Sequence, residues 1–474
     1  MEGSHDTEVD GKSFEQLAVW MIDQKKKLET GLDDGELSPQ QAERQWQQIV
    51  ETVERAGLGE LIEATDPDCE TIWIDDDEYY RVDKNSKTYH ASAGKTVVNR
   101  SVYRKRGEHN GRLVCPVELR WGMVGGRWTP YCARQMSFLG QNQPYGQATK
   151  LAEEMGRLTY SRASFERMTT RLGDDFEVDR ERREDELIEQ LEIPDEAVSV
   201  SVGVDRVSLP LDEAQPSRWE DARKADGDIH YRMAFCATLT LHDAQGRPLW
   251  CKRYGRLPYE GIWVIREQLV WDLKAVLDKA DGLDVICLSD GASQLCDMLD
   301  EAIVEAEFTE QVQRLIDLWH LLEKLADALS AYKDDPQEAR DCLVGWRMWL
   351  LNFDKAADLI EKVLKSWDAR DLEVAGKKPV HQALTYLENH KEQMRYASAR
   401  QQGLPVGSGH VEATCKALVE ARMKRNGQYW KPQGAQAVLN LRALALSDQW
   451  DDAMSLLLEK YQTDAEIYAR KRVA

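Results

Sequence analysis

The chain has 474 residues, of which 42% are hydrophobic and 31% charged, and its formal net charge is −22. This length predicts two to four domains with sizeable cores, and the composition excludes a wholly disordered protein. Because no run of 18 apolar residues is present, we expect no transmembrane helix and no membrane partner. The polar, acidic start is unlike a signal peptide, and the nine cysteines include no CxxC pair. These features predict a cytoplasmic protein with reduced thiols.

The first 194 residues predict three regions, which we place at 1–69, 70–140 and 141–194. The first contains two amphipathic helical patterns, at 13–32 and 38–56, and Ser38-Pro39 marks the start of the second. The second contains short β-rich runs throughout, including 112–119 and 126–133, which predict a small antiparallel unit. The third is a helical connector that ends at Pro194 and is compatible with a helix-turn-helix.

The distribution of charge suggests where an anionic polymer would bind. Residues 1–70 contain 18 acidic and 6 basic side chains, whereas 84–134 contain 11 basic and 2 acidic ones. A second basic stretch, 395–442, contains 8 basic and 2 acidic side chains. Such stretches in an acidic chain are typical of a DNA-contacting surface, although solvated surface charge gives the same pattern. In the first stretch, Arg104, Lys105 and Arg106 are candidate DNA contacts.

From residue 195 the pattern predicts an α/β domain. Strands at 197–211, 230–242 and 247–257 are followed by a helix at 262–280, a strand at 283–291, a helix at 292–306 and a strand at 312–320. An antiparallel trio continued by parallel strands through helical crossovers is the RNase H-like order, which we expect for 195–320. Residues 321–394 are almost purely helical, and 395–474 complete the core with a further helix and C-terminal helices that pack beneath the sheet.

Three carboxylates stand at positions suited to metal binding. Asp205 interrupts an apolar strand, Asp290 ends the fourth strand, and Glu412 begins a helix after the glycine-rich turn 407–409. Carboxylates at one edge of a sheet can hold two divalent cations on a scissile phosphate, and Mg²⁺ or Mn²⁺ suits an oxygen-only site. Each residue alone also has an ordinary structural interpretation, as a hydrogen-bonded strand residue, a turn cap or a first-turn glutamate.

Several segments resemble the DDE transposases of bacterial insertion sequences, specifically the Kra-type group. The resemblance rests on SVGVDRVSLPL, VICLSDGA, RLIDLWHLLEKL and above all LPVGSGHVEATCKALVEARMKRNGQYWKPQGAQAVLNLRAL, and it covers most of 195–452. It implies that Asp205, Asp290 and Glu412 are the metal ligands. It also implies that 321–394, within the 122-residue gap between Asp290 and Glu412, is an all-helical insertion.

Further residues follow from the resemblance. The stretch from Asp317 to His320 is similar to the [CD]-x-x-H signature of insertion-bearing transposases, so His320 would contact a phosphate or orient a metal-bound water, with Asp317 fixing its tautomer. A histidine that caps a strand–helix junction is the alternative. The candidate phosphate contacts near the glutamate helix are Lys416, Arg422, Lys424 and Arg425. In the insertion, Trp346 and Trp349 would stack on an extruded base or belong to its core. The family often carries N-terminal cysteine pairs, of which only Cys115 and Cys132 remain, so we expect no zinc site.

The predicted function is that of a DNA transposase that hydrolyses phosphodiesters at element ends and joins them to target DNA. Its partner is double-stranded DNA, on which it acts as a homodimer or larger assembly without a small-molecule cofactor, associated with the bacterial nucleoid when bound. Alternatives are an RNase H-like nuclease or resolvase without strand transfer, a catalytically silent DNA-binding relic, and a hydrolase of small phosphate esters. The basic stretches disfavour the last, since a small substrate needs no extended track.

Overall fold

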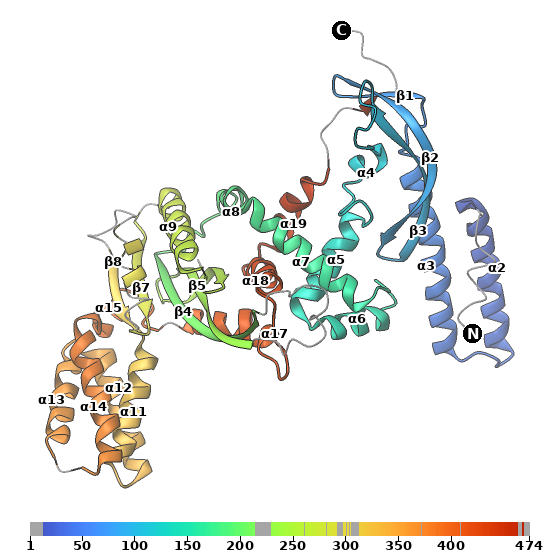
Figure 1. Cartoon of the computed structure of the whole chain (residues 1–474). Coiled ribbons are helices and arrows are strands. Elements are labelled where there is room, and N and C mark those ends of the chain that lie inside the picture. The colour runs from blue at the N-terminus through green and yellow to red at the C-terminus, as the bar shows by residue number, and fades with distance from the viewer. Residues whose placement is uncertain are drawn as a thin grey trace. The chain divides into compact units, whose positions relative to one another are not determined.

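The chain divides into two units, Met1–Asp175 with Asp451–Ala474, and Phe176–Trp450. The computed structural model describes residues 13–213, 229–259, 261–280, 282–291, 297–299, 301–302, 304, 312–370, 372–407, 409–462 and 467–468 (Figure 1). Most of the helix predicted at 292–306 lies outside these residues. Within them, no helix combines the length and the apolar character that crossing a bilayer requires.

Two long helices begin the first unit, as the sequence predicts. Helix α2 spans Phe14–Asp33 and α3 spans Pro39–Glu63, with Ser13 and Ser38 as their N-caps. In both, the serine side chain accepts from the third helical N–H while a glutamine at that position reaches back to the cap. Helix α3 extends seven residues beyond the predicted end, because its apolar residues continue to Ile62, which is fully buried.

A four-stranded antiparallel sheet follows, with the order β3-β2-β1-β9. Its strands are β1 (Thr71–Ile74), β2 (Asp77–Ala91), β3 (Gly94–Lys105) and β9 (Ile467–Tyr468). The prediction of further strands at 112–119 and 126–133 was wrong in the second half of each range, where helices α4 (Pro116–Arg120) and α5 (Pro130–Asn142) begin. In the first halves only isolated β-bridges form, at Val114 and Trp128. Each helix begins with proline at the first helical position, and the Thr129 hydroxyl caps α5. These start signals outweigh the local β propensity.

The predicted helical connector contains three helices. They are α6 (Tyr145–Glu154), α7 (Arg162–Val178) and α8 (Arg180–Glu189). Helix α7 contains residues of both units, because the division falls after Asp175. Helix α8 belongs wholly to the second unit, where Ile188 joins the core of the next sheet.

The second unit contains a mixed five-stranded sheet with the order β6-β5-β4-β7-β8. The strands are β4 (Ser199–Asp212), β5 (Ile229–His242), β6 (Pro248–Arg256), β7 (Asp284–Ser289) and β8 (Val312–Ile316). The first three pair antiparallel, whereas β4, β7 and β8 pair parallel. This order of elements, with helix α9 (Gly261–Lys279) between β6 and β7, agrees with the prediction from the sequence.

The two faces of this sheet are covered by different helices. Val200, Val202 and Val204 of β4 pack in one core with Ile265 and Leu269 of α9. The intervening β4 residues face the other way, because side chains alternate along a strand. On that second face, a Cβ built on Gly203 would lie 3.4 Å from Val411 of α16 (Gly409–Thr414). Asp205 therefore lies on the face that α16 covers.

The segment between β8 and α16 is helical, as predicted. Helices α11 (Leu318–Tyr332), α12 (Pro336–Asn352), α13 (Ala356–Asp368) and α14 (Val374–His390) share one apolar core (Figure 1). Two short elements follow, η1 (Lys391–Gln393) and α15 (Tyr396–Gln401). Tyr396 ties α15 to the sheet, because its hydroxyl donates to the Ile316 carbonyl oxygen of β8 at 2.9 Å.

Helix α16 continues into a π-helical segment and is followed by three more helices. These elements are η2 (Cys415–Glu420), α17 (Ala421–Met423), α18 (Pro432–Leu446) and α19 (Trp450–Glu459). Helix α18 packs against β6 and η2, as expected for a helix beneath the sheet. Leu418 of η2 and Leu439 of α18 pack closely on Gly255 of β6. A Cβ added to Gly255 would lie 2.6 Å from Leu418 and 3.3 Å from Leu439.

Candidate active site

One row across the parallel part of the sheet consists of carboxylates. Leu288 of β7 pairs with Gly203 of β4 and with Leu315 of β8. Because the strands are parallel and side chains alternate, the next row on this face lies two residues further along each chain. It consists of Asp205, Asp290 and Asp317. The last two stand immediately beyond their strands, at the carboxyl edge where ligand sites of α/β sheets gather.

Asp205 is half-buried and surrounded by groups that affect its charge. Burial raises the pKa of this carboxyl, and the nearby charge of Asp290 raises it further. The Arg206 backbone N–H donates to Asp205 Oδ1 at 2.6 Å, and the Cys415 thiol lies 3.5 Å from Oδ2. Both hydrogen bonds and the charge of His320 oppose the rise in pKa. The structure therefore brings Asp205, Asp290 and His320 into one electrostatic cluster.

Asp290 is held by helix α14, which lies about 100 residues later in the chain. The Tyr386 hydroxyl donates to the backbone carbonyl oxygen of Asp290 at 2.8 Å. Gly291 has a φ of +84°, and a Cβ at this position would lie 3.1 Å from Nε2 of His390. Burial lowers the pKa of His390, while the charge of Asp290 acts in the opposite direction. Tyr386 and His390 were not predicted, because nothing in their local sequence pattern links α14 to this edge.

Asp317, and not His320, caps helix α11 at the strand–helix junction. Its carboxylate oxygen Oδ1 accepts from the His320 backbone N–H at 2.8 Å, and its side chain is buried. The Asp317 backbone N–H donates to the Ser289 carbonyl oxygen at 2.8 Å, which extends the β7–β8 pairing to the aspartate. The cap thus fixes the position of His320 at the start of α11, beside Asp205.

Glu412 occupies the first turn of α16, where the helix dipole favours a negative charge. Its carboxylate is exposed and accepts from Nζ of Lys416, one turn further along, at 2.6 Å. Cys415, three residues after Glu412, contacts Asp205. The structure therefore places α16 at the aspartates while the Glu412 carboxylate is directed to Lys416.

The π-helical segment η2 is stabilised by a buried arginine of α18. Arg442 donates from Nε to the carbonyl oxygen of Leu418 at 2.9 Å, and from Nη2 to that of Ala417. Burial lowers the pKa of Arg442 to about 10, so its guanidinium remains charged at neutral pH. π-Helical turns are rare and often stand at functional sites. Here the turn begins at Cys415, which contacts Asp205.

The donor chemistry of this edge fits a hard divalent cation. Asp205 and Asp290 supply carboxylate oxygens on one face, which is the ligand type that Mg²⁺ and Mn²⁺ prefer. Among the described residues, no three acidic, histidine or cysteine side chains converge closely enough to hold one ion. A third ligand from Glu412 would require its carboxylate to exchange Lys416 for the cation.

The candidate phosphate contacts near α16 differ in exposure. Lys416 and Lys424 are exposed and pair with Glu412 and Glu420. Arg425 is half-buried and donates from Nε to the Ala421 carbonyl oxygen at 3.1 Å. Arg422, by contrast, is fully buried, with its guanidinium 4.7 Å from the centre of the Trp430 ring. In this structure the Arg422 guanidinium is part of the interior, not of the surface.

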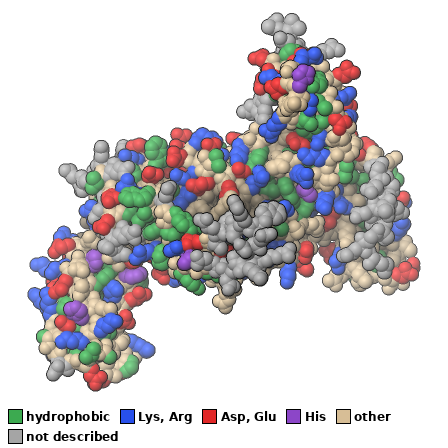
Figure 2. Space-filling view, in the orientation of Figure 1, with side chains coloured by type: hydrophobic (Ala, Val, Ile, Leu, Met, Phe, Trp, Pro, Cys, Tyr) green, Lys and Arg blue, Asp and Glu red, His purple; other side chains and the backbone are tan. Residues whose placement is uncertain are grey.

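The basic side chains of the first unit are largely paired. Lys105 binds Asp77 at 2.5 Å, Arg106 binds Glu78 at 2.8 Å, and Arg104 donates to the His109 carbonyl oxygen at 3.0 Å. On the face shown in Figure 2, basic and acidic side chains alternate over this sheet without a single-sign patch. The excess of positive charge in 84–134 is therefore offset by acids from outside that stretch.

Of the remaining residues that the sequence singled out, three are buried and one is exposed. Trp346 is buried and stacks on Trp367 with a centroid distance of 5.7 Å, so it belongs to the core of the helical segment. Trp349 is 44% exposed. Cys115 and Cys132 are both buried, and burial raises the pKa of each thiol.

Comparisons with known proteins find only distant similarity. No protein-family model and no curated protein matches the sequence. Among solved structures, the chain is similar to a Drosophila P element transposase strand transfer complex, with 10% identity, a TM-score of 0.24 and coverage of 70% of this chain and 81% of that one. It is also similar to a Mos1 transposase paired-end complex with left transposon end, with 14% identity, a TM-score of 0.16 and coverage of 57% and 78%. TM-scores this low do not establish a shared fold.

Proposed function

We propose that this chain is a DDE-type DNA transposase, which hydrolyses phosphodiesters at element ends and transfers the strands to target DNA. The observation that carries the proposal is the position of Asp205 and Asp290 at one register on neighbouring parallel strands, facing the same side. The strand order of three antiparallel strands followed by two parallel ones supports an RNase H-like core. The resemblance of the segment around Glu412 to the motifs of Kra-type transposases supports the choice of reaction.

In this proposal Asp205, Asp290 and Glu412 hold two Mg²⁺ or Mn²⁺ ions. When bound, such ions activate the attacking oxygen and stabilise the leaving oxygen of a phosphodiester. The side chains of the chain itself have other tasks. Cys415 orients Asp205, Tyr386 fixes the backbone at Asp290, and the Asp317 cap positions His320 beside them. Lys416, when released by Glu412, becomes available to a DNA phosphate.

Conservative substitution of the acids tests the proposal. Asp205→Asn, Asp290→Asn and Glu412→Gln keep the side-chain shape but remove a charge that the cations require. Cleavage and joining of an end-containing duplex in Mg²⁺ should fall by orders of magnitude, whereas DNA binding, which depends on basic residues elsewhere, should persist.

Glu420→Gln is the matched control, because Glu420 stands two turns beyond Glu412 and pairs with Lys424 in the same i, i+4 arrangement. This variant should cleave at the rate of the native protein. Native cleavage rates in Asp205→Asn or Glu412→Gln would contradict the metal-ligand assignment. Cleavage without joining would instead favour a nuclease or resolvase.

A further inference from the structure

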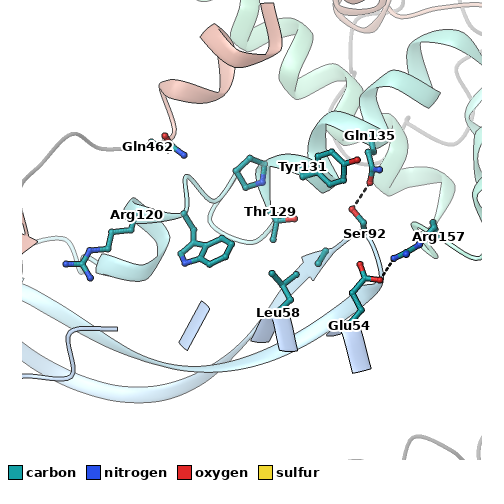
Figure 3. Close-up of a pocket in the computed structure, with 12 residues that line it drawn as sticks. Glu54, Leu58, Ser92, Arg120, Thr129, Tyr131, Gln135, Arg157 and Gln462 are labelled. Atoms are coloured by element: carbon teal, nitrogen blue, oxygen red, sulfur yellow. Dashed lines mark hydrogen bonds and ion pairs between the residues drawn. The ribbon is translucent and has the colours of Figure 1, made fainter. Parts of the chain in front are cut away.

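The first unit contains a pocket that residues of this unit alone line. Its volume is about 590 Å³, within the range of about 300–1,000 Å³ that small-molecule sites occupy. The walls come from α3, from the end of β2 and from the segments around α4 and α5, with Gln462 also at the wall. Figure 3 shows Arg120 at one end and the Ser92–Gln135 and Glu54–Arg157 pairs at the other.

The apolar part of the lining is suited to a flat ring. Leu58, Trp121, Pro130 and Tyr131 all line the pocket. Trp121 is fixed, because its indole N–H donates to the Thr65 hydroxyl at 3.0 Å. Tyr131 is 63% exposed and adds an aromatic face that solvent reaches. Aromatic faces of this kind bind planar heteroaromatic rings by stacking.

The charged groups of the pocket already have partners within the protein. Arg157 pairs with Glu54 at 2.5 Å. Arg120 donates to the carbonyl oxygens of Thr65 and Ile467 at 2.7 and 3.1 Å. Glu54 offsets the charge of Arg157, whereas the carbonyl oxygens hold Arg120 in place without removing its charge. The lining therefore has a single uncompensated positive charge, at the Arg120 end.

The polar groups that remain match the edge of a nucleobase. The Ser92 hydroxyl donates to Oε1 of Gln135 at 2.6 Å. This hydrogen bond fixes which end of the Gln135 amide is the oxygen and which is the NH₂ group. A second amide, Gln462, also lines the pocket. Because Gln135 Oε1 already accepts from Ser92, the NH₂ group of Gln135 is left to donate to a ring nitrogen or a carbonyl oxygen of a base.

We propose that this pocket binds one unstacked nucleobase, by stacking on Tyr131 and Trp121 and by hydrogen bonds to Gln135. The ligand chemistry has two sources, a free nucleoside and an unpaired nucleotide of a DNA strand. The second source rests on the proposed function, because only a DNA-processing protein would meet such strands.

Fluorescence of 2-aminopurine tests the proposal, since stacking quenches this base. The full-length protein, without divalent metal, is titrated into 2-aminopurine deoxyriboside and, separately, into a short single-stranded oligonucleotide with one central 2-aminopurine. We expect saturable quenching of at least the oligonucleotide. Tyr131→Ala should weaken the affinity about five-fold or more, because one aromatic–base stack contributes about that much. Gln135→Ala should also weaken the affinity.

Phe138→Ala is the matched control, because Phe138 is an exposed aromatic residue of the same helix that does not line the pocket. It should bind like the native protein. Quenching of the free deoxyriboside that Tyr131→Ala weakens supports a nucleoside ligand, and quenching confined to the oligonucleotide supports a DNA strand. Absence of saturable quenching, or equal losses in Tyr131→Ala and Phe138→Ala, would overturn the proposal.

The outcome does not depend on catalysis. Asp205→Asn protein should quench 2-aminopurine like the native protein, because Asp205 belongs to the other unit. If the native protein does not cleave DNA while quenching is found, the proposed function fails and the base pocket stands. If quenching is absent while cleavage requires Asp205, the base pocket alone fails.

Discussion

The thiol of Cys415 lies 3.5 Å from Oδ2 of Asp205, so the first residue of a π-helical turn contacts a candidate metal ligand. The contact restricts rotation of the carboxylate, which the Arg206 N–H holds from its other oxygen. Asp205 is thereby oriented by one hydrogen bond from its own strand and one from η2.

Replacing Cys415 by alanine should slow DNA cleavage without unfolding the protein. Loss of one hydrogen bond to a carboxylate that must be oriented corresponds to about 1 kcal/mol, or about a five-fold lower rate. Cys415→Ser is the control, because a hydroxyl of similar size retains the donor. Single-turnover cleavage rates measure the difference. Equal rates in the native protein and Cys415→Ala would show that the thiol does not orient Asp205.

Arg442 should be required for the stability of the π-helical turn. Arg442→Leu leaves the carbonyl oxygens of Ala417 and Leu418 buried without their donor, and such losses cost about 1–3 kcal/mol for each group. We expect a reduction of about 2–4 kcal/mol in the free energy of unfolding, measured with urea. Lys424→Leu, at an exposed position of the next segment, should change it by less than about 0.5 kcal/mol. Similar values for the two variants would contradict this role of Arg442.

The stability of the second unit should depend on pH through His242. Burial, together with the nearby His410, lowers the pKa of His242 to about 4 from its ordinary 6.5, and Oγ of Ser201 lies 2.7 Å from its Nε2. The unfolded chain therefore binds a proton at a pH where the folded chain does not. Stability is complete above pH 6.5 and is lost as the pH falls toward 4, by about 2 kcal/mol at pH 5.

Urea unfolding at pH 7 and pH 5 tests this dependence. His242→Gln retains a hydrogen-bonding group for Ser201 but does not titrate, so the loss between the two pH values should shrink by about 2 kcal/mol. His381→Gln is the control, because His381 is mostly exposed. A loss of the same size in the native protein and His242→Gln would exclude His242 as its origin.

Local signals predicted the parts of the fold that local sequence determines. Ser38-Pro39 marked the start of α3, and the order of strands and helices placed Asp205 and Asp290 at one edge. Thr129-Pro130 carried the same kind of signal, yet the surrounding aromatic and β-branched residues led to a wrong prediction of β structure. The neighbours of Asp290 could not be predicted, because Tyr386 reaches it through the packing of four helices.

Burial was equally hard to foresee at Arg422. Its position near the Glu412 helix, in a basic stretch of the chain, suggested a phosphate contact. In the structure Arg422 lies in the interior against Trp430, which follows eight residues later in the chain. This contact forms only when the chain folds back, so the local sequence does not reveal it.

DNA affinity in the first unit should depend more on Lys95 and Arg127 than on Lys105 and Arg106. Lys95 and Arg127 are both exposed. Burial lowers the pKa of His90, and the charges of Lys95 and Arg127 lower it further, so both cations lie near this ring. The structure pairs Lys105 and Arg106 with acids and, within the residues it describes, forms no ion pair with Lys95 or Arg127. Cations without an acidic partner are available to replace counterions of a phosphate backbone.

The slope of log affinity against log salt concentration measures this difference on a DNA duplex. The double variant Lys95→Gln/Arg127→Gln should reduce the magnitude of the slope by about 2, since each phosphate contact contributes about 0.9. Lys105→Gln/Arg106→Gln should reduce it by less than about 1, because these side chains must first leave Asp77 and Glu78 to reach a phosphate. Equal reductions in the two double variants would show that the ion pairs open freely on DNA, and a larger one for Lys105 and Arg106 would reverse the assignment.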